Sequence, residues 1–169
     1  MIFKRHKLKM TNKLFKISLF KRYKALAVVC VFFLGFHESA IAGLEYLSIA
    51  GNAVIMYNAP SLKADKLYVA SRNLPVEAVV RVEGWVKVRD SSGALAWVEQ
   101  KMVSDKRYVI VTELQAKVYQ EPDINSALVF QAQKDVILEW MGPPLHGWIK
   151  VQHRDGQSGY VKIAQVWGS

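Results

Sequence analysis

The chain has 169 residues, a single cysteine and a formal net charge of +9 at pH 7. The charge is unevenly distributed, because residues 1–42 hold nine lysines and arginines against one acid (net +8), whereas residues 43–169 hold fourteen against thirteen (net +1). Since binding to phosphates needs a basic surface, the nearly neutral second part argues against a nucleic-acid partner.

The first 42 residues follow the order of basic, apolar and small residues that is typical of a secretory signal peptide. A basic stretch runs to Lys24, twelve apolar residues follow over 25–36, and Ala40-Ile41-Ala42 provides the small residues of a cleavage site. We therefore predict a signal peptide helix over residues 1–42, cleaved between Ala42 and Gly43 and in contact with the membrane only during export. An uncleaved anchor is the alternative, but twelve apolar residues fall short of the roughly 20 that span a bilayer.

Cys30 lies inside the apolar run and follows Val28 and Val29. A lipid-modified cysteine would instead follow small residues at the end of such a run, so we do not expect a lipoprotein. After cleavage no cysteine remains, and the exported part can form neither a disulfide nor a reactive thiol. We expect a periplasmic or secreted protein, whose true start is either Met1 or Met10.

The remaining sequence contains an internal repeat. The segment Gly84-Trp85-Val86-Lys87-Val88 recurs 63 residues later as Gly147-Trp148-Ile149-Lys150-Val151. Trp97-Val98 recurs at the same offset as Tyr160-Val161, and Tyr57-Asn58-Ala59-Pro60 matches Tyr119-Gln120-Glu121-Pro122 at an offset of 62. Three blocks in one order at nearly one offset predict two copies of one domain. We place the first domain at residues 43–106 and the second at 107–169.

Each copy has the pattern of short strands separated by turns. Apolar and polar residues alternate over 76–82 and 85–89, a period of two that indicates half-buried strands. Turn sequences follow at 83–84, 90–93 and 154–157, and a Pro-rich stretch at 142–146 lengthens one loop of the second copy. The sequence thus predicts an all-β fold of two small β-barrels in tandem. The joint at 104–107 is short and has neither Pro nor Gly, so we expect the barrels to pack on one another.

The repeated blocks resemble those of the bacterial SH3-like domains, whose pattern contains Gly-Trp-x-Lys-Val, a Gly turn and Gly-Trp-Val. The matching residues of the first copy are Ala59-Pro60-Ser61, Gly84-Trp85-Val86-Lys87-Val88 and Ala96-Trp97-Val98. Those of the second copy are Glu121-Pro122-Asp123, Gly147-Trp148-Ile149-Lys150-Val151 and Gly159-Tyr160-Val161. The resemblance extends over about residues 44–169 and is greatest to exported proteobacterial proteins with tandem SH3-like domains. It implies barrels of five to six strands and, in many relatives, a targeting role at the cell wall.

The sequence offers few groups for catalysis. Residues 43–169 contain only two histidines, His146 and His153, and both fall in predicted loops or turns. A zinc site needs three or four ligands, and a general base needs a positioned partner. Asp155 stands near His153, but two loop histidines exposed to solvent are the simpler interpretation. We therefore expect no enzyme, no metal site and no cofactor.

Six aromatic residues recur at corresponding positions of the two copies and are the candidates for ligand binding: Trp85, Trp148, Trp97, Tyr160, Tyr57 and Tyr119. Aromatic side chains on a small barrel can stack on sugar faces or on peptide side chains, although such residues often fill the core instead. Alternation places Val86 and Val88 on one face of a strand and Trp85 on the other. If the valines face inward, Trp85 and Trp148 become the better surface candidates. Trp167 is expected to hold the C-terminus in place or to face the other barrel.

Two functions fit this sequence. The first is a non-catalytic module of the cell envelope that recognises peptidoglycan or a cell-wall peptide, an interpretation that depends on the resemblance. The second is an adaptor pair that binds another envelope protein with the same surfaces.

Overall fold

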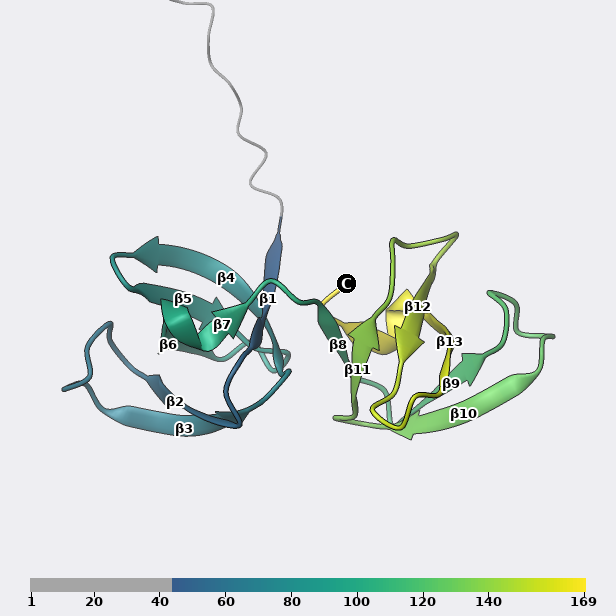
Figure 1. Cartoon of the computed structure of the whole chain (residues 1–169), viewed down its shortest axis with the longest axis horizontal. Helices are drawn as coiled ribbons and strands as arrows, with labels where there is room; N and C mark the ends of the chain where they lie inside the picture. Colours follow the sequence, from purple (N-terminus) through teal and green to yellow (C-terminus); the bar gives the residue numbers. More distant parts are fainter. Residues whose placement is uncertain (1–43) are drawn as a thin grey trace, which may run out of the picture. The chain divides into compact units, whose positions relative to one another are not determined.

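The computed structural model describes residues 44–169, which belong to one compact unit, Gly43–Ser169 (Figure 1). The predicted signal peptide and its cleavage site at Ala42 and Gly43 lie outside the described residues. Residues 44–169 contain no helix that is long and apolar enough to cross a membrane.

The first repeat is a seven-stranded antiparallel sheet. Its elements are β1 (Glu45–Ile49), β2 (Ala53–Tyr57), β3 (Lys66–Ser71), β4 (Pro75–Val82), β5 (Trp85–Arg89), β6 (Leu95–Glu99), the 3-10 helix η1 (Gln100–Met102) and β7 (Val103–Ser104). The strands are ordered β3-β2-β6-β5-β4-β1-β7, so the last strand pairs with the first.

The second repeat has the same elements in the same order. They are β8 (Tyr108–Val111), β9 (Gln115–Tyr119), β10 (Leu128–Gln133), β11 (Ile137–Trp140), β12 (Trp148–Gln152), β13 (Ser158–Lys162), the 3-10 helix η2 (Ile163–Gln165) and β14 (Val166–Trp167). The order β10-β9-β13-β12-β11-β8-β14 repeats that of the first sheet. The all-β prediction of two small barrels in tandem is confirmed. The strand count exceeds the expected five to six partly because β7 and β14 each add a two-residue strand.

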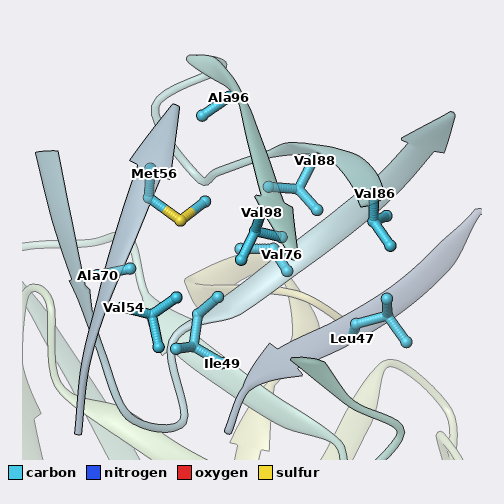
Figure 2. Close-up of a cluster of buried hydrophobic side chains, with 10 residues drawn as sticks. All are labelled: Leu47, Ile49, Val54, Met56, Ala70, Val76, Val86, Val88, Ala96 and Val98. Atoms are coloured by element: carbon cyan, nitrogen blue, oxygen red, sulfur yellow. The ribbon is translucent and has the colours of Figure 1, made fainter. Parts of the chain in front are cut away.

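Each repeat has its own hydrophobic core, built from alternate residues of its strands. Figure 2 shows the ten side chains of the first core directed toward one another from β1, β2, β3, β4, β5 and β6. Val86 and Val88 are fully buried there, and their counterparts Ile149 and Val151 are fully buried in the second core. The repeated Gly-Trp-x-Lys-Val block therefore places its valines inward, as its alternation predicts.

The connection before this block differs between the repeats. In the first, residues 83–84 form a two-residue turn with Gly84 at φ +72°, a backbone conformation that glycine adopts without steric cost. In the second, residues 141–147 form the predicted longer loop. Pro143 and Pro144 have no N–H to donate to a ladder, so β11 ends at Trp140, whereas β4 extends over eight residues. The loop therefore grows mainly at the expense of the strand.

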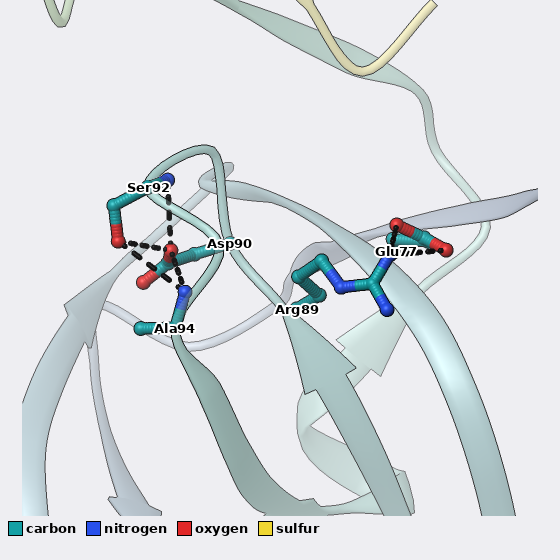
Figure 3. Close-up of polar contacts among 5 residues, drawn as sticks. All are labelled: Glu77, Arg89, Asp90, Ser92 and Ala94. Carbon is teal, nitrogen blue, oxygen red and sulfur yellow. Dashed lines mark hydrogen bonds and ion pairs between the residues drawn. The ribbon is translucent and has the colours of Figure 1, made fainter.

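Polar contacts fix the hairpin that carries the repeated block (Figure 3). The Oδ1 atom of Asp90 accepts hydrogen bonds from the backbone N–H of Ser92 at 2.9 Å, from the Ser92 hydroxyl at 2.6 Å and from the backbone N–H of Ala94 at 3.1 Å. This is the local side-chain bonding that favours aspartate in turns. Arg89 and Glu77, which face each other across β5 and β4, form an ion pair at 3.1 Å. Both sets of contacts hold β5 and its neighbours in register.

The two repeats contact each other through side chains on either side of the joint. Tyr46 of β1 meets Trp167 of β14 edge to face, with ring centroids 5.1 Å apart. The Arg107 guanidinium lies 4.0 Å from the ring centroid of Trp140 and 5.3 Å from that of Tyr46, and it donates a hydrogen bond of 2.7 Å to the carbonyl of Gly168. The predicted packing of the barrels is confirmed, and Trp167 faces the other repeat.

Candidate binding site

The six candidate aromatic residues form two equivalent clusters, one on the outer face of each barrel. We call Tyr57, Trp85 and Trp97 the first aromatic cluster, and Tyr119, Trp148 and Tyr160 the second aromatic cluster. None of the six belongs to the hydrophobic cores that residues 44–169 form.

Three adjacent strands build the first aromatic cluster. Tyr57 of β2 is the cross-strand partner of Trp97 on β6, and Trp97 is in turn the partner of Lys87 on β5. The rings of Tyr57 and Trp85 meet edge to face, with centroids 5.5 Å apart and planes at 87°. The Lys87 ammonium lies 5.9 Å from the centroid of the Trp97 ring, within the range of a cation–π contact.

The second aromatic cluster repeats this geometry. Tyr119 of β9 pairs with Tyr160 of β13, and Tyr160 pairs with Lys150 of β12. Tyr119 and Trp148 meet edge to face at 5.8 Å and 89°, and the Lys150 ammonium lies 6.0 Å from the centroid of the Tyr160 ring. The repeat thus preserves an arrangement in space as well as residue types, even where tyrosine replaces tryptophan.

The accessibility of the two tryptophans differs from the expectation in one case. Trp85 is half-buried, as a surface candidate should be, but Trp148 is only 8% exposed. Trp148 does point away from the core, as predicted, yet Tyr119 packs on it and the Lys162 ammonium lies 5.6 Å from its ring centroid. The expectation of an exposed Trp148 was therefore wrong, because neighbours on the outer face cover the ring.

Tyr57 is also buried, at 6% exposure, by Trp85 and the adjoining strands. The ring surface open to a ligand therefore belongs to the half-buried members, which are Trp85, Trp97, Tyr119 and Tyr160.

The charges beside the two clusters are different. Glu99 is the cross-strand partner of Trp85 and forms an ion pair with Lys101 at 2.8 Å. Lys162 is at the equivalent position beside Trp148. Local sequence does not mark Glu99 or Lys162 as part of a site, whereas the lysines beside Trp97 and Tyr160 belong to the two Gly-Trp-x-Lys-Val blocks and could have been found from that repeat.

The chemistry available at the clusters is that of binding. The open rings can stack on the flat face of a sugar or on an aliphatic chain, and the lysine ammonium groups can donate hydrogen bonds to a carboxylate. Within residues 44–169, no group of three or more His, Cys, Asp and Glu side chains is placed to hold a metal ion.

The structure brings His153 and Asp155 together at the turn between β12 and β13. The Nδ1 atom of His153 lies 3.0 Å from Asp155, and the ring of His153 packs against Phe130 with centroids 5.8 Å apart. The backbone N–H of Gln157 and the imidazole of His153 lower the pKa of the Asp155 carboxyl. His153 and Asp155 are therefore in direct contact, and their contact helps to fix the turn.

Comparison with known proteins adds a family to this geometry. The model of the bacterial SH3 domain matches residues 50–105 and again residues 113–168, one match for each repeat. No curated protein matches the chain.

Three solved structures are similar to parts of it. NlpC1 of Trichomonas vaginalis is 15% identical, with a TM-score of 0.36 over 78% of this chain and 48% of that one. NlpC2 of the same organism is 12% identical, with a TM-score of 0.35 over 77% of this chain and 50% of that one. An NlpC/P60 family protein from Bacillus cereus ATCC 10987 is 15% identical, with a TM-score of 0.34 over 72% of this chain and 55% of that one. The chain spans about half the length of these proteins.

The two matches to the family model cover most of the chain and coincide with the two barrels. The chain therefore belongs to the bacterial SH3 domain family and contains two SH3-like β-barrels in tandem.

Proposed function

We propose that this protein is a non-catalytic binding module of the cell envelope that recognises peptidoglycan through its two aromatic clusters. The observation that carries the proposal is the recurrence of one aromatic and lysine arrangement on the outer faces of both barrels. All six side chains lie outside the two core clusters, and four of them keep part of their surface exposed, so core packing alone does not explain their repeated placement.

The chemistry of peptidoglycan fits the clusters. Its sugars present flat faces to aromatic rings, and its peptides carry carboxylates that lysine can bind. Two equivalent sites on one chain also suit a polymer with repeating units, because the second contact becomes intramolecular and strengthens the first.

Binding to another envelope protein is the second candidate, and one observation favours it. The outer face of β2 and β3 carries Ile55 beside Val69, with Leu67 nearby, and Leu67 and Val69 are 48% and 63% exposed. The second repeat has Lys117 and Gln131 at the positions of Ile55 and Val69. β10 of the second repeat still exposes Leu128 and Val129, but the apolar pair of Ile55 and Val69 is found only in the first, and exposed apolar side chains grouped in this way are typical of a protein contact.

Co-sedimentation with purified cell-wall sacculi tests the first proposal. The protein is recovered after export, where mass spectrometry should show a start at Gly43. We expect it to sediment with sacculi, and we expect Trp85→Ala or Tyr160→Ala to weaken binding roughly 5- to 150-fold, because each removes about 1–3 kcal/mol of aromatic contact.

Leu114→Ala is the control, because it truncates an exposed side chain in the loop between β8 and β9, outside both clusters. It should leave sedimentation unchanged. Failure of the wild-type protein to sediment would contradict the proposal. Cross-linking of the wild-type protein to one envelope protein, lost in Val69→Asp, would favour the second candidate.

A further inference from the structure

A groove separate from both aromatic clusters lies where turns of the two repeats face each other. It has a volume of about 520 Å³, and an adjoining groove of about 280 Å³ shares Arg72, Asn73 and Tyr108 with it. The first repeat contributes the turn at residues 71–73, and the second contributes parts of β8, β11 and the turn after β12. A volume of this size accommodates a small ligand.

Backbone hydrogen bonds fix the two turns that line the groove. Asn73 and Asp135 are at equivalent positions of the two repeats, with φ of +68° and +67°. The N–H of Asn73 donates to the carbonyl of Ile49 at 2.8 Å, and the N–H of Asp135 donates to that of Val111 at 2.9 Å. Each turn is therefore held by a hydrogen bond to the first strand of its own barrel.

Arginines from both repeats line the groove. The Nε atom of Arg72 donates to the carbonyl of Ala50 at 3.0 Å, which orients the guanidinium, and the Arg72 terminal nitrogens have no hydrogen-bond partner among residues 44–169. Arg154, from the second repeat, is exposed and forms no ion pair within the same residues. Two guanidinium groups are therefore available to a ligand.

The carboxylates of the groove are not equally available. Glu139 forms an ion pair of 2.8 Å with Lys106, and hydrogen bonds to Glu139 and Tyr108 raise the pKa of that lysine. Asp135 is exposed and has no ion-pair partner among the described residues. Val136 and Ile137, both half-buried, supply apolar surface beside these groups. The free charges of the groove are thus two cations and one anion.

We propose that this groove binds a short peptide that carries two carboxylates and one ammonium group. The carboxylates pair with Arg72 and Arg154, and the ammonium group lies beside Asp135. Arg–carboxylate pairs are among the stronger hydrogen-bonded contacts in proteins, and the ligand supplies the charges that the groove lacks. The site goes beyond the proposed function, because it shares no residue with the aromatic clusters and either site can exist without the other.

Two designed peptides test this inference on residues 43–169, the compact unit that contains both cores. Acetyl-Ala-Glu-Lys has two carboxylates and one ammonium group, and acetyl-Ala-Gln-Lys-amide has the same length without the carboxylates. Binding is followed by the shifts of backbone N–H signals in NMR spectra. We expect the first peptide to shift signals of residues 71–73 and 135–137, and the second to bind at least tenfold more weakly.

Variants assign the contacts. Arg72→Ala and Arg154→Ala should each weaken binding of acetyl-Ala-Glu-Lys about five- to tenfold, and Asp135→Asn about two- to threefold, because these groups are exposed and screened by water. Lys117→Ala removes an exposed cation outside the groove and should change nothing. Binding of this peptide should also survive Trp85→Ala, which separates this site from the sacculus-binding site.

Three results would overturn the inference. They are no shift in the groove with acetyl-Ala-Glu-Lys at millimolar concentration, equal binding of the two peptides, and unchanged affinity in both arginine variants.

Discussion

Replacing Arg107 with alanine is expected to lower the free energy of unfolding by about 2–3 kcal/mol. The Arg107 guanidinium lies over Trp140 and donates a hydrogen bond of 2.7 Å to the Gly168 carbonyl, both in its own repeat, and it also lies near Tyr46 of the first repeat. A hydrogen bond from a charged donor and two cation–π contacts would be lost together. Burial lowers the pKa of Arg107, which shows that the charge is partly desolvated.

The expected loss of stability is not larger because two polar groups at this contact lack hydrogen-bond partners. The Nε atom of Arg107 and the indole N–H of Trp140 are both buried without a hydrogen-bond partner within residues 44–169. Each such group costs free energy in the folded wild-type protein, and Arg107→Ala removes one of them. The net effect is therefore smaller than the sum of the favourable contacts.

Urea unfolding of wild-type protein, Arg107→Ala and Arg107→Lys measures this effect. The lysine variant keeps the charge but loses the planar guanidinium, so it should fall between the other two. We also expect the unfolding transition of Arg107→Ala to be less cooperative than that of the wild type, because the contact of Arg107 with Tyr46 is lost while that of Tyr46 with Trp167 remains. An alanine variant as stable as the wild type would show that Arg107 does not hold the repeats together.

Gly159→Ala is expected to cost about 2–4 kcal/mol of stability. A Cβ atom at this position would lie 2.8 Å from Cγ1 of Val118 and closer still to the carbonyl oxygen of Tyr119. Real Cβ atoms do not approach backbone this closely, so β13 would have to move away from β9. These two strands carry Tyr160 and Tyr119, so the two tyrosines of the second aromatic cluster should also move apart.

The first repeat provides the matched control, because Ala96 stands at the equivalent position and is buried there at 1% exposure. Ala96→Gly should cost only about 1 kcal/mol, mainly from the freedom that glycine adds to the unfolded chain. Thermal unfolding of both variants measures the difference. Equal effects at the two positions would mean that the strands are not closer together in the second repeat.

The sequence predicted the fold well where local alternation decides the outcome. Val86 and Val88 face the core because a strand alternates its side chains, and that period is visible in one short segment. The burial of Trp148 could not be predicted from this alternation. The side chains that cover it, Tyr119 and Lys162, come from β9 and β13, and their positions depend on the register of strands far apart in the sequence.

The contact between the repeats illustrates the same limit. Arg107 is one charged residue in a short joint of the sequence, and nothing local indicates that Tyr46, Trp140 and the Gly168 carbonyl surround it. The groove beside Arg72 and Arg154 could not be predicted from the sequence either, because residues of two different barrels line it. Repetition in a sequence predicts two similar domains, but the residues at their contact are not repeated.

The indole N–H signals of the five tryptophans test the central claim most directly. Trp85 and Trp97 lie in the first aromatic cluster and Trp148 in the second, whereas Trp140 and Trp167 lie at the contact between the repeats and act as internal controls. When soluble peptidoglycan fragments are added, we predict that the signals of Trp85 and Trp97 shift and that those of Trp140 and Trp167 stay in place. Shifts confined to Trp140 and Trp167, or no shift at any tryptophan, would contradict recognition through the aromatic clusters.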